Sequence, residues 1–135
     1  MNNVKLINLP KVIDERGNLS FFENEDQIPF VIKRTYWIYD VPGGETRGGH
    51  AFKESNEFII ALSGSFDVVL NDGKKESKFS LNRSYKGLFV PNLKWRRLEN
   101  FSTNSLALIV SSIEYDESDY IRGFKDFKDT LNEII

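Results

Sequence analysis

The chain has 135 residues, 40% of them hydrophobic and 13% aromatic, which is enough for one packed core. We therefore expect a single domain over residues 1–135. Eighteen basic against 20 acidic residues give a net charge of -2, without the basic excess of a nucleic-acid binder. The absence of cysteine excludes disulfides and thiolate chemistry, and no signal peptide or apolar run long enough for a membrane span is visible, so we expect a cytoplasmic protein.

Short segments rich in aromatic and β-branched residues recur between turn signals, a rhythm typical of a β-sandwich or barrel. In chain order, strands are expected at residues 4–9, 19–22, 34–39, 57–62, 66–70, 79–81, 88–90 and 106–111. Ser63-Gly64-Ser65 and Asn71-Asp72-Gly73 lie between such segments and are interpreted as hairpin turns. Both turns favour antiparallel pairing.

The pattern changes from Asp119 onward to an amphipathic one. Apolar residues then recur every three or four positions, at Tyr120, Phe124, Phe127, Leu131 and Ile134. This spacing predicts one terminal helix. Its apolar stripe could cover the barrel or a partner subunit, and the sequence leaves both possibilities open.

The spacing Gly-x5-His-x-Phe-x4-Glu-x6-Gly, which runs from Gly44 through His50, Phe52 and Glu57 to Gly64, is a cupin barrel signature. It predicts an all-β, cupin-like (jelly-roll) barrel with a short C-terminal α-helix. A cupin usually binds its metal with two histidines and a glutamate from this motif, and with another histidine from a second motif of the form Pro-x-Gly-x-x-His-x3-Asn.

The second motif resembles the segment from Pro91 to Asn100, in which Arg96 occupies the place of the histidine. Of the four metal-ligand positions only His50 and Glu57 remain. Phe52 offers no lone pair, and the fixed charge of Arg96 would repel a divalent ion. We therefore expect neither a metal nor a cofactor. An imidazole beside a cation suits the binding of an anionic substrate and the movement of a proton.

Three segments carry a further resemblance: IKRTYWIYD at 32–40, RGGHAFK at 47–53 and YDESDYIR at 115–122. They resemble the dTDP-sugar 3,4-ketoisomerases, and the likeness extends over nearly the whole chain. The resemblance implies a small, cupin-like homodimer that converts dTDP-4-keto-6-deoxyglucose into its 3-keto isomer without a metal. The expected partner is thus a dTDP-linked 4-keto-6-deoxy sugar. The family usually carries His-Ala-His-Lys, so Phe52 departs from its pattern.

His50 is the expected base, because it could remove the hydrogen on carbon 3 next to the carbonyl, and an imidazole of ordinary pKa, ~6.5, suits that task. Arg96 could stabilise the resulting oxyanion. Return of the proton by His50 from the same face would set the galacto configuration at carbon 4. Delivery by Tyr36 or water, or a ring flip, would give the gluco product, and the sequence does not choose.

A diphosphate needs cations, and the candidates are Arg16, Arg34, Arg47, Lys53 and Arg122. Phe52 completes the expected substrate-binding set. Alternatives stay open for two of the cations, since Arg96 could form a surface salt bridge and Lys53 could face solvent or a second subunit. A different class of function also stays open, a sugar-nucleotide-binding cupin module without turnover.

Overall fold

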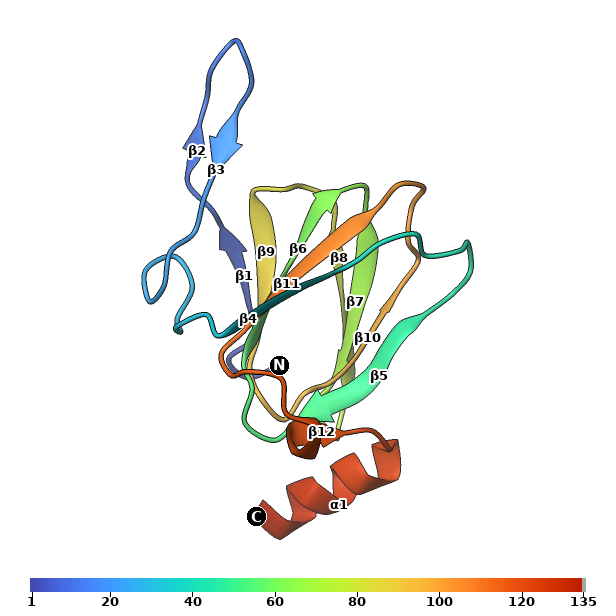
Figure 1. The fold of residues 1–135 in the computed structure, drawn as a ribbon. Coiled ribbons are helices and arrows are strands. Elements are labelled where there is room, and N and C mark those ends of the chain that lie inside the picture. The colour runs from blue at the N-terminus through green and yellow to red at the C-terminus, as the bar shows by residue number, and fades with distance from the viewer. Residues whose placement is uncertain (135) are drawn as a thin grey trace.

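Two antiparallel five-stranded sheets face each other in the computed structural model, which describes residues 1–134 (Figure 1). The first sheet has the order β1 (Lys5–Asn8), β9 (Lys86–Val90), β6 (Glu57–Ser63), β11 (Leu106–Ser111), β4 (Arg34–Ile38). The second has the order β12 (Tyr120–Ile121), β5 (Arg47–Phe52), β10 (Trp95–Glu99), β7 (Phe66–Asn71), β8 (Glu76–Leu81). The predicted cupin-like β-barrel is confirmed.

The alternation of side chains along β6 explains how a carboxylate enters the interior. Ile59 and Ala61 belong to the core between the two sheets, whereas Phe58 and Ile60 pack on the outside of the first sheet. Both faces of β6 are therefore covered, so its apolar run is almost continuous. Because side chains alternate along a strand, Glu57 points the same way as Ile59, into the barrel.

A short hairpin stands apart from the two sheets. It is formed by β2 (Lys11–Val12) and β3 (Leu19–Ser20), and it projects away from the barrel (Figure 1). Val12 and Leu19 are exposed on it. The strand predicted at 19–22 is thus shorter than expected, and Leu19 does not reach the core, whereas Phe22 beyond the strand packs against Phe58.

One of the two predicted hairpin turns is confirmed and the other is wrong. Asn71-Asp72-Gly73 joins β7 to β8, which pair directly, and Asn71 Oδ1 accepts a hydrogen bond from the Gly73 amide at 2.7 Å. Ser63-Gly64-Ser65 instead connects β6 to β7, which belong to opposite sheets. That turn carries the chain across the barrel because each strand finds its partners elsewhere in the sequence.

The C-terminal helix begins later than its apolar spacing predicts. A 3-10 helix (Glu117–Asp119) and β12 come first, and the α-helix α1 runs over Phe124–Ile134. Tyr120 and Ile121 pair with Phe52 and Ala51 of β5, so the predicted helical stripe is wrong at Tyr120. Of the stripe, Phe127 is buried against Ala51 and Ile121, so the helix covers the barrel. Neither helix among residues 1–134 is long and apolar enough to span a membrane.

Candidate active site

A cavity of about 520 Å³ opens between the two sheets, within the size range of small-molecule sites. Polar side chains from five strands, β4, β5, β6, β10 and β12, converge on it, together with one arginine that follows β12. Its lining includes Tyr36, Arg47, His50, Glu57, Arg96, Tyr120 and Arg122. The site therefore combines an imidazole, a carboxylate, two phenols and several guanidinium groups in one enclosed space.

The register of β5 and β10 brings His50 and Arg96 together, since these two residues are direct cross-strand partners. A β-bulge follows between Arg96 and Arg97, opposite Gly48. Gly48 has a φ of 102°, and a Cβ there would lie 3.0 Å from the Arg97 Cα and 3.1 Å from the Arg96 carbonyl oxygen. Only glycine fits this position without strain.

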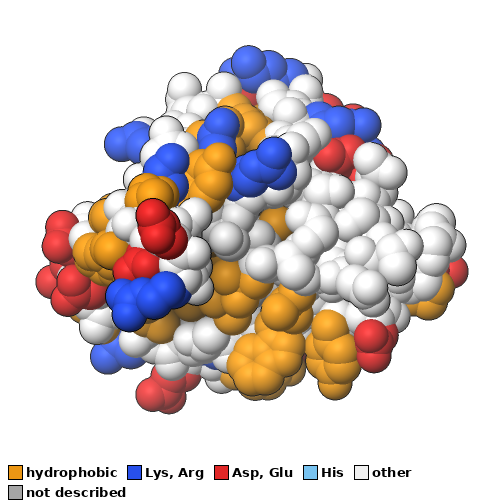
Figure 2. Space-filling model, turned by 90° about the horizontal axis from the view of Figure 1, so that it is seen from above, with side chains coloured by type: hydrophobic (Ala, Val, Ile, Leu, Met, Phe, Trp, Pro, Cys, Tyr) orange, Lys and Arg blue, Asp and Glu red, His pale blue; other side chains and the backbone are white. Residues whose placement is uncertain are grey.

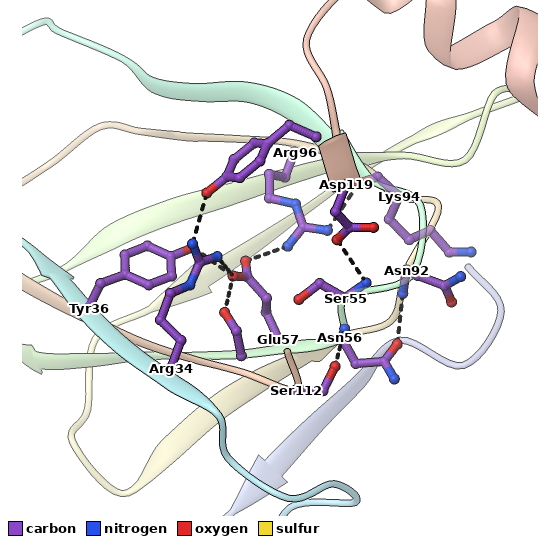
Figure 3. Close-up of polar contacts among 12 residues, drawn as sticks. Arg34, Tyr36, Ser55, Asn56, Glu57, Asn92, Lys94, Arg96, Ser112 and Asp119 are labelled. Carbon is purple, nitrogen blue, oxygen red and sulfur yellow. Dashed lines mark hydrogen bonds and ion pairs between the residues drawn. The ribbon is translucent and has the colours of Figure 1, made fainter. Parts of the chain in front are cut away.

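Glu57 is the centre of a buried polar network (Figure 3). Arg96 Nη1 donates to Glu57 Oε1 at 2.8 Å, and the hydroxyls of Tyr36 and Ser111 donate to Oε2 at 2.7 and 2.5 Å. Arg34 Nη2 lies 3.7 Å from Oε2. Glu57 and Arg96 are only 1% and 2% exposed, so Arg96 forms a buried ion pair rather than a surface one, and hydrogen bonds offset the cost of its desolvation.

His50 is held in its neutral form. Burial, followed by the positive charges of Arg96, Arg122 and Arg34, lowers the pKa of its imidazole from the ordinary 6.5 to about 3. The pKa of His50 is therefore lower than the ordinary value that the sequence led us to expect. At neutral pH the ring is a free base, as abstraction of a proton requires.

Several nitrogen atoms in the cavity region have no partner within residues 1–134. They are His50 Nε2, Arg34 Nε and Arg96 Nε, all buried. Buried polar groups are normally hydrogen-bonded, so unsatisfied atoms grouped at one cavity indicate room for a polar ligand.

Tyr36 lies in the cavity as expected, but its hydroxyl is already committed to Glu57. Burial raises the pKa of Tyr36 strongly, and the negative charge of Glu57 raises it further. Tyr36 therefore keeps its proton and fixes the orientation of the Glu57 carboxylate.

Tyr120 is a cavity residue that the apolar spacing assigned to the helix instead. Its ring centroid lies 5.2 Å from that of His50 and 4.6 Å from that of Phe52. Arg34 Nη1 donates to the Tyr120 hydroxyl at 3.2 Å. The pairing of β12 with β5 produces this placement, and the only signal in the sequence was the family-like tail that contains Tyr120.

Two of the predicted cations line the cavity, and a third lies beside it. Arg47 and Arg122 line it and remain exposed, whereas Arg34 is partly buried beside Tyr120. Arg122 binds both oxygens of Glu117, at 2.6 and 2.9 Å, and this contact lowers the pKa of Glu117 to about 2. Of the two exposed guanidinium groups, Arg122 is therefore paired with Glu117, whereas Arg47 has no ion pair within residues 1–134.

Arg16, Lys53 and Phe52 do not line the cavity. Arg16 lies in the turn of the β2–β3 hairpin and is bonded to Asp14 at 2.7 Å. Lys53 is exposed just beyond β5, which agrees with the alternative in which it faces solvent. Phe52 is 1% exposed and packs behind His50 and beneath the Arg96 guanidinium, 4.9 Å from its ring centroid.

A metal centre is not formed by the side chains that the structure describes. Within residues 1–134, no group of three or more His, Cys, Asp or Glu residues is arranged to bind an ion. His50 and Glu57 both line the cavity, but Arg96 is ion-paired with the Glu57 carboxylate. The donor set does not fit a cupin metal.

Residues 2–132 match the family model described as FdtA, WxcM-like, C-terminal. A curated relative from Aneurinibacillus thermoaerophilus, TDP-4-oxo-6-deoxy-alpha-D-glucose-3,4-oxoisomerase, is 39% identical over 96% of this chain and 94% of its own. Among solved structures, a 3,4-ketoisomerase from Helicobacter canadensis is 40% identical, with a TM-score of 0.94 over 96% of this chain and 98% of its own.

A second solved structure is a His-to-Asn variant of the 3,4-ketoisomerase QdtA from Thermoanaerobacterium thermosaccharolyticum in complex with TDP-4-keto-6-deoxyglucose. It is 34% identical to this chain, with a TM-score of 0.95 over 98% of this chain and 96% of its own. The resemblance seen in the three sequence segments is therefore confirmed over almost the full length. The chain belongs to the FdtA (WxcM-like, C-terminal) family, among the sugar 3,4-ketoisomerases.

Proposed function

We propose that this protein is a sugar-nucleotide 3,4-ketoisomerase that converts dTDP-4-keto-6-deoxyglucose into a dTDP-3-keto-6-deoxyhexose. The observation that carries the proposal is a neutral imidazole, His50, facing a cavity of about 520 Å³ beside several guanidinium groups. This combination serves proton abstraction next to a carbonyl on a substrate that carries a diphosphate. The relatives named above, with this activity or this ligand, favour the enzyme over a binding module without turnover.

The base in this reaction is His50. It removes the hydrogen of carbon 3, and the electron pair forms an enediolate whose negative charge develops on the oxygen of carbon 4. A guanidinium group stabilises that charge best in a site that excludes water. Arg96 serves this purpose because Glu57 fixes it and because its Nε has no partner among residues 1–134.

Substrate binding tunes the basicity of His50. Burial and the charges of Arg96, Arg122 and Arg34 lower its pKa, and a weakly basic imidazole is a weak proton acceptor. The two negative charges of a bound diphosphate offset the part of this shift that the cations cause, so the pKa of His50 rises as the substrate binds. The base thus becomes stronger only when the substrate is present.

The diphosphate binds at the mouth of the cavity. Arg47 and Arg122 are exposed there, on β5 and just after β12, and Arg34 lies outside the cavity lining, against Tyr120 and Glu57. Lys53 and Arg16 lie outside the lining of the same chain, so we give them no role in the first contact with the phosphates.

A homodimer is the second part of the proposal. Trp37, Tyr39 and Leu62 are exposed on the outer face of β4, β11 and β6, and with Leu106 and Leu108 they line an apolar hollow of about 450 Å³. Figure 2 displays hydrophobic side chains gathered along one margin of the molecule. Such a patch is unusual for a monomer.

The place of the patch favours a second copy as its cover. Strand β4 lies at the end of its sheet, where unpaired backbone groups favour the addition of another strand. The projecting β2–β3 hairpin exposes apolar side chains of its own, including Ile13 at 71%. Association of two copies would cover both apolar surfaces, the hollow beside β4 and the β2–β3 hairpin.

The test of the function uses purified protein, dTDP-4-keto-6-deoxyglucose and heavy water. We expect conversion to the 3-keto isomer with deuterium entering at carbon 4, and His50→Asn lowering turnover by ~10²-fold or more because the base is lost. Substrate binding by that variant and its thermal unfolding serve as controls for the fold. Tight binding of the sugar nucleotide by the wild-type protein with neither exchange nor conversion would establish the binding module instead.

A further inference from the structure

The isomerisation moves more than one proton, and the cavity holds only one histidine. Carbon 3 loses a hydrogen, carbon 4 gains one, and the hydroxyl proton changes from the oxygen of carbon 3 to that of carbon 4. A second side chain able to exchange a proton would complete the set. Tyr36 is committed to Glu57 and its pKa is raised, so it is poorly suited to give up its proton.

Tyr120 is the other phenol that lines the cavity. Its ring lies 5.2 Å from that of His50, centroid to centroid, so one substrate ring can contact both side chains. It occupies this place because it pairs across the strands with Phe52, whose ring centroid is 4.6 Å from its own.

The preceding residue fixes Tyr120 to the barrel. The buried carboxylate of Asp119 accepts a hydrogen bond from the amide of Ser55 at 3.2 Å (Figure 3). It accepts a second one from the amide of Glu54 at 2.8 Å. Its carbonyl oxygen accepts another from the amide of Lys53 at 2.9 Å. The tail is thereby held to the turn that follows β5, and Tyr120 is positioned rather than mobile.

Two guanidinium groups lie against the phenol of Tyr120. Arg34 Nη1 donates to the Tyr120 oxygen at 3.2 Å, which leaves the O–H of Tyr120 free to donate to a substrate. The Arg122 guanidinium lies 4.3 Å from the centroid of the same ring. The phenol thus lies between two cations, with its proton free for a ligand.

We propose that Tyr120 is a further catalytic residue, the group that delivers the proton to carbon 4; this inference rests on the proposed function. After His50 has taken the hydrogen of carbon 3, the imidazolium returns a proton to the oxygen of carbon 4, which gives a neutral enediol. Tyr120 then gives its phenolic proton to carbon 4, and the electron pair of the carbon–carbon double bond forms the new C–H bond. The oxygen of carbon 3 becomes the carbonyl, and its proton returns to the phenolate.

The experiment separates the two proton transfers in Tyr120→Phe, which removes a single oxygen atom. In heavy water we expect this variant to exchange the hydrogen of carbon 3 in recovered substrate at a rate near that of the wild type, because His50 is intact. Formation of the 3-keto product falls by ~10²-fold or more, because the donor to carbon 4 is missing. Tyr115→Phe is the matched control, since Tyr115 lies beside Tyr120 but outside the cavity lining, and its exchange and conversion stay at wild-type rates.

The outcomes are distinct. Retained exchange with lost conversion supports the role of Tyr120. A parallel loss of both rates would assign it to positioning His50, and unchanged conversion would leave it no role in turnover, so either result overturns the inference. Failure of the proposed function differs from all of these, because the wild-type protein would then neither exchange nor convert.

Discussion

Single side chains in this cavity take their chemistry from their neighbours. His50 is an ordinary imidazole whose burial and three nearby guanidinium groups keep it neutral. Arg96, one residue across the strand pair, is itself balanced by the buried carboxylate of Glu57. The consequence is a neutral base beside a cation.

The pKa of His50 can be measured directly, because it is the only histidine in the chain and gives a single set of imidazole resonances. In an NMR titration of the free protein we expect the ring to stay neutral as the pH falls below 6.5 and to gain its proton only toward about 3. Addition of dTDP raises that pKa, because the anion offsets the cations. A free-protein pKa near 6.5 would contradict this account.

The same shift links pH to stability. Because folding lowers the pKa of His50, the unfolded chain binds the proton first, and the free energy of unfolding falls as the pH drops from 6.5 toward 3. His50→Asn lacks this contribution, so its urea unfolding should be less sensitive to acid in that window. The denatured protein serves as the reference, with an imidazole pKa of about 6.5.

At this scale the sequence could identify residues but not their contacts. His50 and Glu57 followed from one motif spacing, and Arg96 followed from the second motif. Glu57 accepts hydrogen bonds from Arg96, Tyr36 and Ser111 at the same time. This arrangement depends on the register of strands that lie far apart in the chain, and no local sequence pattern encodes that register.

Among the elements, β5 shows how a strand can lack a strand signal. Its sequence Arg47-Gly48-Gly49 contains no β-branched residue, so residues 47–52 did not stand out. The strand forms because it pairs with β10 and β12, and the bulge at Gly48 sets His50 opposite Arg96. The same limit applies to β12, whose Tyr120 matched a helical spacing and yet pairs with β5.

The close approach of Gly48 to the backbone of β10 predicts that a side chain at this position destabilises the fold. Gly48→Ala should lower the free energy of unfolding by about 1–3 kcal/mol, because alanine is strained at its φ of 102° and its Cβ would press on the backbone of β10. Gly43→Ala is the matched control, with no atom within 4 Å of its added Cβ, and should change stability by less than about 0.5 kcal/mol. Urea unfolding of both variants measures this difference in the free energy of unfolding, and equal values would refute the prediction.

For the whole molecule, the sequence predicted the barrel architecture more fully than the surface through which two copies would associate. Alternating strands, the cupin spacing and the terminal helix were enough for a barrel. Which apolar residues remain outside depends on the tertiary arrangement, so Trp37 and Tyr39, within a predicted strand, could not be recognised as surface residues.

Association is expected to depend on that outer face. Trp37→Glu places a charge in the apolar patch of β4, so we expect a shift from dimer to monomer in sedimentation velocity. Ile134→Glu is the control, because Ile134 is exposed at 62% on α1 at another part of the surface, and it should leave the dimer unchanged. A wild-type protein that sediments as a monomer would refute the proposed homodimer.

The distribution of charge in the cavity has a consequence for how a ligand enters. Arg47 stands exposed at the mouth with no ion pair within residues 1–134, whereas Arg122 is matched by Glu117 and the deepest cation, Arg96, by Glu57. A sugar nucleotide is therefore admitted in one direction only, with its uncharged hexose leading and its anionic linkage stopping at the rim. A nucleoside diphosphate without the hexose would occupy the rim alone, and it would block the entrance while the inner half stayed filled with water.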